Sequence, residues 1–325
     1  MDAAAPRTAG ESRRGPSAFS VQRVELGGPR GDPEAVRHRR RHRQEDPMPV
    51  DDESEPRLDF GGATPYEDYV RASVLTSLQQ PRSGDPAEMA FLVTTQVMEL
   101  WFRLLTHEWD HARRALRDDD VATGVTSLRR SLPTLAALVA SWQPIAWLTP
   151  TQFNSYRSAL GEGSGFQSAQ YRHLEFVLGD RSTNFLTPHR ADPVAHASLE
   201  RELATPSLYD EALRLLHRRG HRLPASVLDR EPSLRHEHTE AVERAWADIY
   251  RAEGTADEER DLLSLGEVLT DVAEGVWRWR QDHLMATRRA MGDKTGTGGS
   301  SGVAWLTKRA ARPVFPELWS ARGRV

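Results

Sequence analysis

The chain has 325 residues, no cysteine and a formal net charge of −4 at pH 7. The absence of cysteine excludes disulfides, thiolate-bound metal sites and thiol nucleophiles, and it fits a reducing cytoplasm. The nearly balanced charge gives no reason to expect nucleic-acid binding by the whole chain. No apolar run approaches the ~20 residues that span a bilayer, so the composition favours a cytoplasmic protein without a membrane partner.

Residues 1–57 differ in composition from the rest of the chain. They are rich in Arg, Pro, Gly and acidic residues and poor in aromatic and branched ones. Such a segment buries too little apolar surface to offset the entropy that is lost on ordering, so we predict a disordered tail. The basic run from Arg37 to Arg43 is compatible with a nucleic-acid or partner contact, but we favour a solvated tail.

Apolar residues recur at helical spacing from residue 58 onward, and strand signals are nearly absent. A short amphipathic helix is expected through Tyr66, Tyr69, Val70, Val74 and Leu78. Further helices are predicted, in chain order, at 87–117, 121–140, from Pro150, 166–178, 197–218, 234–251 and 258–291. Asp85 and Thr149 are placed to cap two of them. The pattern predicts one all-α domain over residues 58–325.

The predicted helix at 258–291 carries one histidine on its apolar face. Steps of three and four keep this stripe on one side, and it consists of Leu262, Leu265, Leu269, Val272, Val276, Trp279, His283 and Ala286. A lone histidine is too little for zinc, which needs at least three protein ligands. It is enough for haem, because the porphyrin supplies four nitrogens. The alternative is a histidine that is satisfied within the core or at its boundary.

A glycine-rich loop follows this helix from Gly292 to Gly302. Its backbone donors and hydroxyls suit an anionic group. Because Lys294 precedes the glycine run, the loop lacks the order of a phosphate-binding P-loop, and a mobile linker is the alternative. Earlier in the chain, Arg157 shares a helix face with Phe153. This arginine can bind a carboxylate through paired hydrogen bonds, or it can simply lie over the ring at the surface.

Several longer motifs stand in the order found in one enzyme family. They are Tyr66-Glu-Asp-Tyr69-Val, Glu99-Leu-Trp-Phe, Ser164-Gly-Phe-Gln-Ser-Ala-Gln-Tyr-Arg172, Glu175-Phe-Val-Leu-Gly, Trp279-Arg-Gln-Asp-His283, the glycine-rich loop and Phe315-Pro-Glu-Leu-Trp319. With these motifs, residues 60–322 resemble the tryptophan 2,3-dioxygenase family. The resemblance implies a haem-binding helical bundle of the tryptophan/indoleamine dioxygenase type, with haem b as cofactor. Such proteins are usually homotetramers that add O₂ to the indole ring of L-tryptophan.

The same resemblance implies roles for individual residues. His283 matches the proximal ligand of the haem iron, and Arg157 matches the residue that binds the substrate carboxylate. Thr297 would hold the amino-acid end of the substrate, and Phe91 would pack on the indole. Ser164 and Gly165 would line the distal haem face. Tyr66, Tyr69 and Val70 would come from a neighbouring subunit and close the pocket.

Two positions depart from the family pattern. Thr95 stands where the family has a histidine that faces the indole nitrogen, and Phe153 stands where it has a tyrosine whose hydroxyl aids carboxylate binding. Threonine can accept a hydrogen bond but cannot act as a base near neutral pH. Loss of the phenol removes one contact of about 0.5–1.5 kcal/mol. We therefore expect a larger and less polar pocket than the family pattern implies.

Three functions stay open from the sequence. The first is 2,3-dioxygenation of tryptophan or a tryptophan derivative, with an N-formylkynurenine-like product. The second, favoured by Thr95 and Phe153, is a haem-dependent monooxygenase or hydroxylase that gives an oxindole or hydroxylated tryptophan-derived product in secondary metabolism. The third is a non-catalytic protein that binds haem or tryptophan.

Overall fold

The computed structural model describes residues 56–252 and 256–325. Contacts divide the chain into one unit that ends at Pro65 and a second unit from Tyr66 to Val325. The predicted disordered tail lies outside the described residues, apart from residues 56–57. The expected domain boundary at residue 58 stays a prediction.

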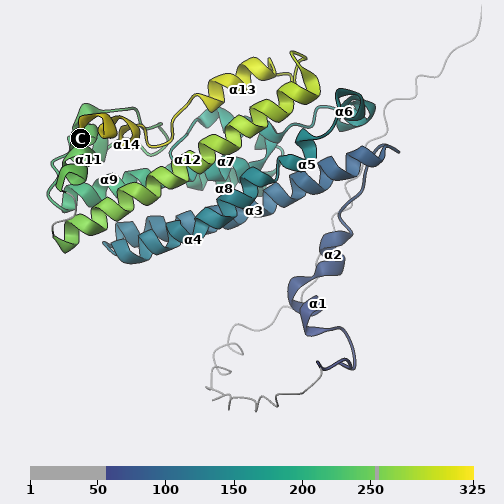
Figure 1. Ribbon diagram of the computed structural model, residues 1–325, viewed down its shortest axis with the longest axis horizontal. Coiled ribbons are helices and arrows are strands. Elements are labelled where there is room, and N and C mark those ends of the chain that lie inside the picture. Colours follow the sequence, from purple (N-terminus) through teal and green to yellow (C-terminus); the bar gives the residue numbers. More distant parts are fainter. Residues whose placement is uncertain (1–55, 253–255) are drawn as a thin grey trace, which may run out of the picture. The chain divides into compact units, whose positions relative to one another are not determined.

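All regular elements of the described residues are helical, which confirms the predicted all-α class. The α-helices, labelled in Figure 1, are α1 (Pro65–Val70), α2 (Ala72–Thr76), α3 (Pro86–Arg117), α4 (Val121–Ala140), α5 (Gln143–Ala146), α6 (Pro150–Arg157), α7 (Ala169–Val177), α8 (Pro193–Ala204), α9 (Leu208–Arg218), α10 (Ala225–Leu228), α11 (Glu240–Ala252), α12 (Asp257–Met291), α13 (Val303–Ala310) and α14 (Pro316–Ser320). The 3₁₀ helices are η1 (Ser158–Leu160), η2 (Gly165–Gln167), η3 (Thr183–His189) and η4 (Ala321–Arg324). Among the described helices, none combines the length and the apolar character required to cross a bilayer.

Three long helices form the centre of the second unit (Figure 1). α4 packs against both α3 and α12. Their buried faces carry large apolar side chains, and Leu105 on α3, Leu128 on α4 and Leu269 on α12 have no exposed surface. Gly275 allows the close approach of α12 and α4, because a Cβ atom at this position would overlap the side chain of Leu135. The apolar stripe predicted on α12 is thus buried mainly against α4.

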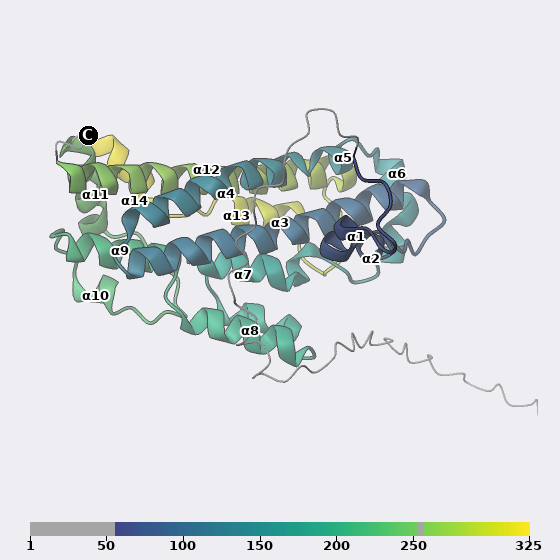
Figure 2. The ribbon, with the colours of Figure 1, turned by 90° about the horizontal axis from the view of Figure 1, so that it is seen from below.

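Smaller helices pack around this centre (Figure 2). α7 and α9 contact α3, α8 contacts α7, and α13 contacts α12. α5 and α6 each contact both α3 and α12, near the start of α3 and the end of α12 (Figure 1). This end of the bundle therefore brings together the helices that carry Phe91, Arg157 and His283.

The predicted bounds of the long helices are close to the observed ones. α4 spans the predicted residues, and α3 and α12 each begin one residue earlier than predicted. The Asp85 side chain accepts a hydrogen bond from the Ala87 N–H and so caps α3. Thr149 caps α6 in a capping box with Gln152. Apolar spacing and cap residues are local signals, which is why these bounds were predictable.

Two predicted helices are each divided into two. The helix predicted at 197–218 consists of α8 and α9, because Pro206 lacks an N–H and disfavours helical backbone at Thr205. Ser207 then caps α9 by accepting a hydrogen bond from the Asp210 N–H. The helix predicted through residues 66–78 consists of α1 and α2, which are separated at Arg71, where φ is 57°.

Two further predicted bounds were wrong because side chains bind backbone groups there. The helix predicted at 166–178 begins as η2, and α7 starts only after Ser168, whose hydroxyl accepts from the Tyr171 N–H. α11 starts at Glu240 instead of Leu234. Before it, the Thr239 N–H donates to Glu317, a tertiary contact in place of a helical one. The short elements α5, α10 and η3 were not predicted.

Candidate active site

The candidate iron ligand His283 lies where the apolar face of α12 reaches the end of the bundle. The other members of its stripe are at most 6% exposed, whereas the imidazole is partly exposed. Burial lowers the pKa of His283 to about 4, because desolvation disfavours the charged imidazolium. The imidazole is therefore neutral at pH 7, which is the form that binds metals.

Aromatic rings surround the imidazole of His283. Trp142 stacks on it with ring centroids 4.5 Å apart and planes 8° apart, and the ring of Trp279 lies 5.9 Å away. Among the described residues, neither imidazole nitrogen has a hydrogen-bond partner. A neutral imidazole with a free lone pair in apolar surroundings fits a haem ligand. No group of three or more His, Asp or Glu side chains within residues 56–252 and 256–325 could hold a metal ion instead.

The glycine-rich loop packs against the turn between η1 and η2. The Thr297 hydroxyl donates to the carbonyl oxygen of Gly163 at 2.6 Å. A Cβ atom on Gly298 would lie 2.9 Å from the Cβ of Ser164, so only glycine permits this approach without movement. Lys294 donates to the Asn154 side chain on α6 at 3.1 Å. The loop is thus tied to two other segments, which disfavours the mobile linker considered above.

Arg157 joins α6 to the same loop. One of its terminal nitrogens, Nη2, donates to the backbone carbonyl of Thr295. Its Nε is buried and has no hydrogen-bond partner among the described residues. The guanidinium therefore does not simply lie over Phe153, and it keeps N–H groups that could donate hydrogen bonds to a carboxylate.

Three aromatic side chains, two of them on the same helix as Arg157, pack against one another. The ring of Phe91 on α3 lies 6.5 Å from that of Phe153 and 5.7 Å from that of Tyr156. Thr95, one turn after Phe91, donates its hydroxyl hydrogen to the carbonyls of Phe91 and Leu92 at 3.0 and 2.9 Å. Since both bonds use Thr95 as donor, its oxygen still has lone-pair capacity to accept a bond.

Tyr66, Tyr69 and Val70 stand apart from the other site residues in the single chain. They lie on α1 and are 67%, 90% and 39% exposed. No hydrogen bond or ring contact of the described residues joins them to Phe91 or Arg157. Their expected role, which involves a neighbouring subunit, stays a prediction.

The comparison with known proteins identifies the family. The family model described as tryptophan 2,3-dioxygenase matches residues 51–325. The chain belongs to the tryptophan 2,3-dioxygenase family. The tryptophan 2,3-dioxygenase of Burkholderia pseudomallei is 40% identical over 82% of this chain and 86% of its own length. That of Bradyrhizobium diazoefficiens is 40% identical over 81% and 94%, and that of Pseudomonas fluorescens is 39% identical over 83% and 94%.

Membership in the tryptophan 2,3-dioxygenase family confirms the resemblance inferred from the motifs. It also confirms the predicted enzyme class, a haem-dependent oxidoreductase of the tryptophan 2,3-dioxygenase type. The roles of single residues in this chain are not tested by the match.

A buried ion cluster that sequence reasoning missed joins α7, α12 and α13. Glu175 and Asp180 each bind Arg280 on α12 and Arg309 on α13, and Arg172 also pairs with Glu175 at 2.6 Å. All five side chains are at most 8% exposed. The two carboxylates thereby join α12, which precedes the glycine-rich loop, to α13, which follows it. The motifs that contain Arg172, Glu175 and Arg280 were the available signal, but the cluster joins residues up to 134 positions apart in sequence.

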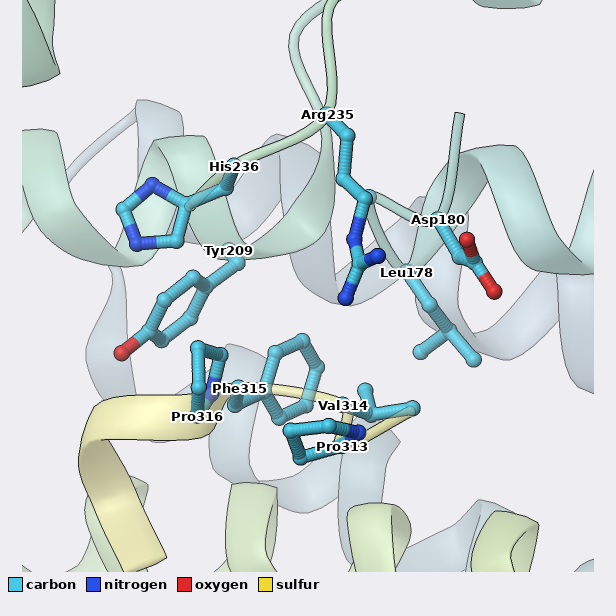
Figure 3. Close-up of a pocket in the computed structure, with 10 residues that line it drawn as sticks. Leu178, Asp180, Tyr209, Arg235, His236, Pro313, Val314, Phe315 and Pro316 are labelled. Carbon is cyan, nitrogen blue, oxygen red and sulfur yellow. The ribbon is translucent and has the colours of Figure 1, made fainter. Parts of the chain in front are cut away.

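The cavity in Figure 3 is separate from the candidate active site. It is lined by Leu178, Gly179, Asp180, Tyr209, Arg235, His236 and residues 313–316. Its volume is about 20 Å³, which suits at most a water molecule. None of the predicted substrate-binding residues lines it.

A second hollow, of about 310 Å³, lies between α3 and α9. Four arginines line it, and each is paired with a carboxylate: Arg113 with Glu202 and Asp110, Arg114 with Asp110, Arg117 with Asp118, and Arg214 with Glu211. Among the described residues that line the hollow, no arginine is without a carboxylate partner. The hollow is therefore not a ready anion site.

Proposed function

We propose that this chain is a haem-dependent 2,3-dioxygenase that acts with O₂ on the indole ring of L-tryptophan or a close tryptophan derivative. The product would be of the N-formylkynurenine type, formed by opening the C2–C3 bond of the indole. The observation that carries the proposal is the position of His283, which is stacked on Trp142 at the same end of the bundle as Arg157 and the glycine-rich loop.

His283 would be the single protein ligand of haem b. Its lowered pKa keeps one ring nitrogen free of a proton at neutral pH, and Trp142 and Trp279 pack beside the ring. When bound, the haem supplies the iron that activates O₂. Ser164 and Gly165 would line the distal face, where small residues leave room for O₂.

Arg157 and Thr297 would hold the amino-acid end of the substrate. A guanidinium binds a carboxylate through two parallel hydrogen bonds, which fixes orientation as well as affinity. The bond from Arg157 to Thr295 ties this binding group to the glycine-rich loop. Substrate binding and loop position are thus linked through one side chain.

Phe91 would pack on the indole, and Phe153 would line the pocket without the polar contact of the family's tyrosine. Tyr66, Tyr69 and Val70 of a neighbouring subunit would close the pocket in a homotetramer. The exposure of these three side chains in the single chain supports this assignment, because large apolar side chains gathered on one short helix favour burial by a partner. The pocket would then exclude water only in the assembled oligomer.

Thr95 limits which proton transfers the pocket can carry out. Its hydroxyl already donates to backbone carbonyls, so toward an indole N–H it can only accept. Addition of oxygen at indole C2 does not formally require removal of the N–H proton. The dioxygenation proposed above is therefore compatible with threonine at this position.

The second candidate function is a haem-dependent monooxygenase or hydroxylase of secondary metabolism. Thr95 and Phe153 favour it, because they replace two polar groups of the family pattern and leave space for a substituted tryptophan. An oxindole or a hydroxylated tryptophan derivative would be the product.

One experiment separates these functions. The reduced haem protein is incubated with L-tryptophan and O₂, and the products are analysed by mass spectrometry for added oxygen atoms. Two added oxygens with a kynurenine-type absorbance support the dioxygenase, and one added oxygen supports the monooxygenase. A protein that binds haem but converts no indolic amino acid, with or without peroxide, is a binding protein only. A His283→Ala variant with an unchanged haem spectrum would overturn the ligand assignment.

A further inference from the structure

The indole of Trp142 lies flat against the imidazole of His283. Trp142 precedes α5, where the chain leaves α4, and His283 comes from α12, 141 positions later. The ring centroids are 4.5 Å apart and the planes differ by 8°. A parallel contact of this kind restricts rotation of the imidazole about its own side-chain bond, because rotation would drive one ring edge into the other ring.

We propose that Trp142 is a positioning residue that sets the plane of the His283 imidazole for iron binding. The inference rests on the proposed function, in which His283 is the haem ligand. A histidine that binds a metal is usually oriented by a hydrogen bond from its second ring nitrogen to a carboxylate or carbonyl group. Among the described residues, the imidazole of His283 has no such partner. Ring stacking therefore takes over the orienting role.

Trp142 is itself held by packing and not by its polar group. Its ring contacts Trp279 at 5.6 Å, and Trp279 is 6% exposed. Trp279 in turn packs edge-on against Phe102 at 5.5 Å and lies 5.0 Å from Tyr171. The indole Nε1 of Trp142 is buried without a hydrogen-bond partner among the described residues. A chain of rings thus connects the imidazole plane to the core between α3 and α12.

The stacking surface and the indole N–H can be separated by substitution. Trp142→Leu removes the flat ring, whereas Trp142→Phe keeps a ring and removes only the N–H. Trp147 offers a matched control, because it lies five positions later and is 78% exposed. Trp147→Leu therefore loses an indole of the same chain segment without touching His283.

The test is made on the haem-loaded full-length protein. The iron–histidine stretching band of the ferrous form is recorded by resonance Raman spectroscopy, and the rate of haem loss to excess apomyoglobin is measured. We expect Trp142→Leu to shift or broaden the band and to speed haem loss several-fold. Trp142→Phe and Trp147→Leu should stay close to the parent protein. Far-UV circular dichroism checks the fold, and Trp142→Met replaces the leucine variant if that variant does not fold.

Two results would overturn the proposal. One is a leucine or methionine variant with the parent band position, band width and rate of haem loss. The other is a phenylalanine variant as perturbed as the leucine variant, which would assign the effect to the N–H. Failure of the proposed function looks different, because His283→Ala would then keep its haem. If His283→Ala loses its haem but Trp142→Leu behaves like the parent protein, only the role of Trp142 is rejected.

Discussion

At the scale of single residues, Arg157 is the group through which this chain would recognise an amino acid. Its guanidinium bridges α6 and the glycine-rich loop through the Thr295 carbonyl and retains an unpaired Nε. A hydrogen bond to a charged group contributes about 1.5–3 kcal/mol. The arginine should therefore matter for substrates that carry a carboxylate and little for those that lack one.

Arg157→Leu tests this expectation. We expect kcat/KM for L-tryptophan to fall by about 10- to 150-fold per charge-assisted hydrogen bond lost. Binding of tryptamine, which lacks the carboxylate, should change little, and its dissociation constant is measured by the shift of the haem absorption band. Arg157→Lys is the matched control for charge without the planar fork. If binding of L-tryptophan and of tryptamine weakens by the same factor, Arg157 acts through the loop and not through the carboxylate.

At the scale of elements, the ion cluster of Glu175 joins α7, α12 and α13. Glu175 has no exposed surface and faces Arg172, Arg280 and Arg309. Removing one partner of a buried ionic group leaves an uncompensated charge, which is more costly than the net contribution of the pair.

Glu175→Gln should lower the free energy of unfolding by about 3–5 kcal/mol. Chemical denaturation followed by circular dichroism measures this change. The matched control is Glu274→Gln, which breaks a solvent-exposed pair with Arg278 on α12 and should change the free energy of unfolding by about 0–1 kcal/mol. Equal effects of the two substitutions would contradict the structural role of the cluster.

The C-terminal segment is tied to α11 by Glu243. This carboxylate accepts hydrogen bonds from Ser320, at 2.6 Å, and from His238, at 2.7 Å, and it also pairs with Arg324. The Ser320 hydroxyl and the other partners lower the pKa of Glu243 to about 2. A carboxyl group whose pKa is lowered by folding stabilises the folded state above its unfolded pKa of about 4.3, and this contribution is lost as the pH falls toward 2.

Glu243→Gln should therefore lower the melting temperature at pH 7. The difference from the parent protein should shrink as the pH falls from about 4.5 to 2, because the parent carboxyl then gains a proton too. Thermal melts over this range measure it, with Glu274→Gln as the exposed control. A difference that is independent of pH would mean that the charge of Glu243 is not responsible.

At the scale of the whole molecule, the proposed site is complete only if subunits share residues. Arg157 would act in its own subunit, whereas Tyr69 would act in the neighbour, where its 90% exposed ring becomes covered. This arrangement differs from a site in which every residue comes from one chain, and the difference can be measured without a structure of the oligomer.

Complementation between two inactive variants tests the shared site. Arg157→Leu and Tyr69→Ala chains are co-expressed in equal amounts, and mixed oligomers are isolated by two affinity tags. Random assembly should restore about a quarter of the sites, because each intact site takes Arg157 from one variant and Tyr69 from the other. Light scattering on the parent protein should give the mass of a tetramer. Mixed oligomers no more active than the single variants would place both residues in one chain.

The amino-acid sequence alone was sufficient for the class of fold and for most of the long helices. Apolar spacing and caps such as Asp85 and Thr149 are local, so α3, α4, α6 and α12 were predicted closely. The motifs around Ser164 and His283 were sufficient for the family. The predicted helix bounds were wrong at Ser168, Arg71 and residues 234–239, because backbone conformation or side-chain contacts there override the apolar periodicity.

The tertiary structure alone decided how the site is assembled. No spacing in the sequence relates Trp142 to His283 or Glu175 to Arg309, because the residues of each pair are more than 130 positions apart. The contact of Thr297 with Gly163 is equally remote. A sequence specifies helices through neighbours three and four positions away, whereas stacking, buried charge pairing and loop docking depend on which helix faces meet when the core is packed. The local sequence pattern was thus enough to single out His283 as the candidate iron ligand, whereas the orientation of its imidazole depends on packing.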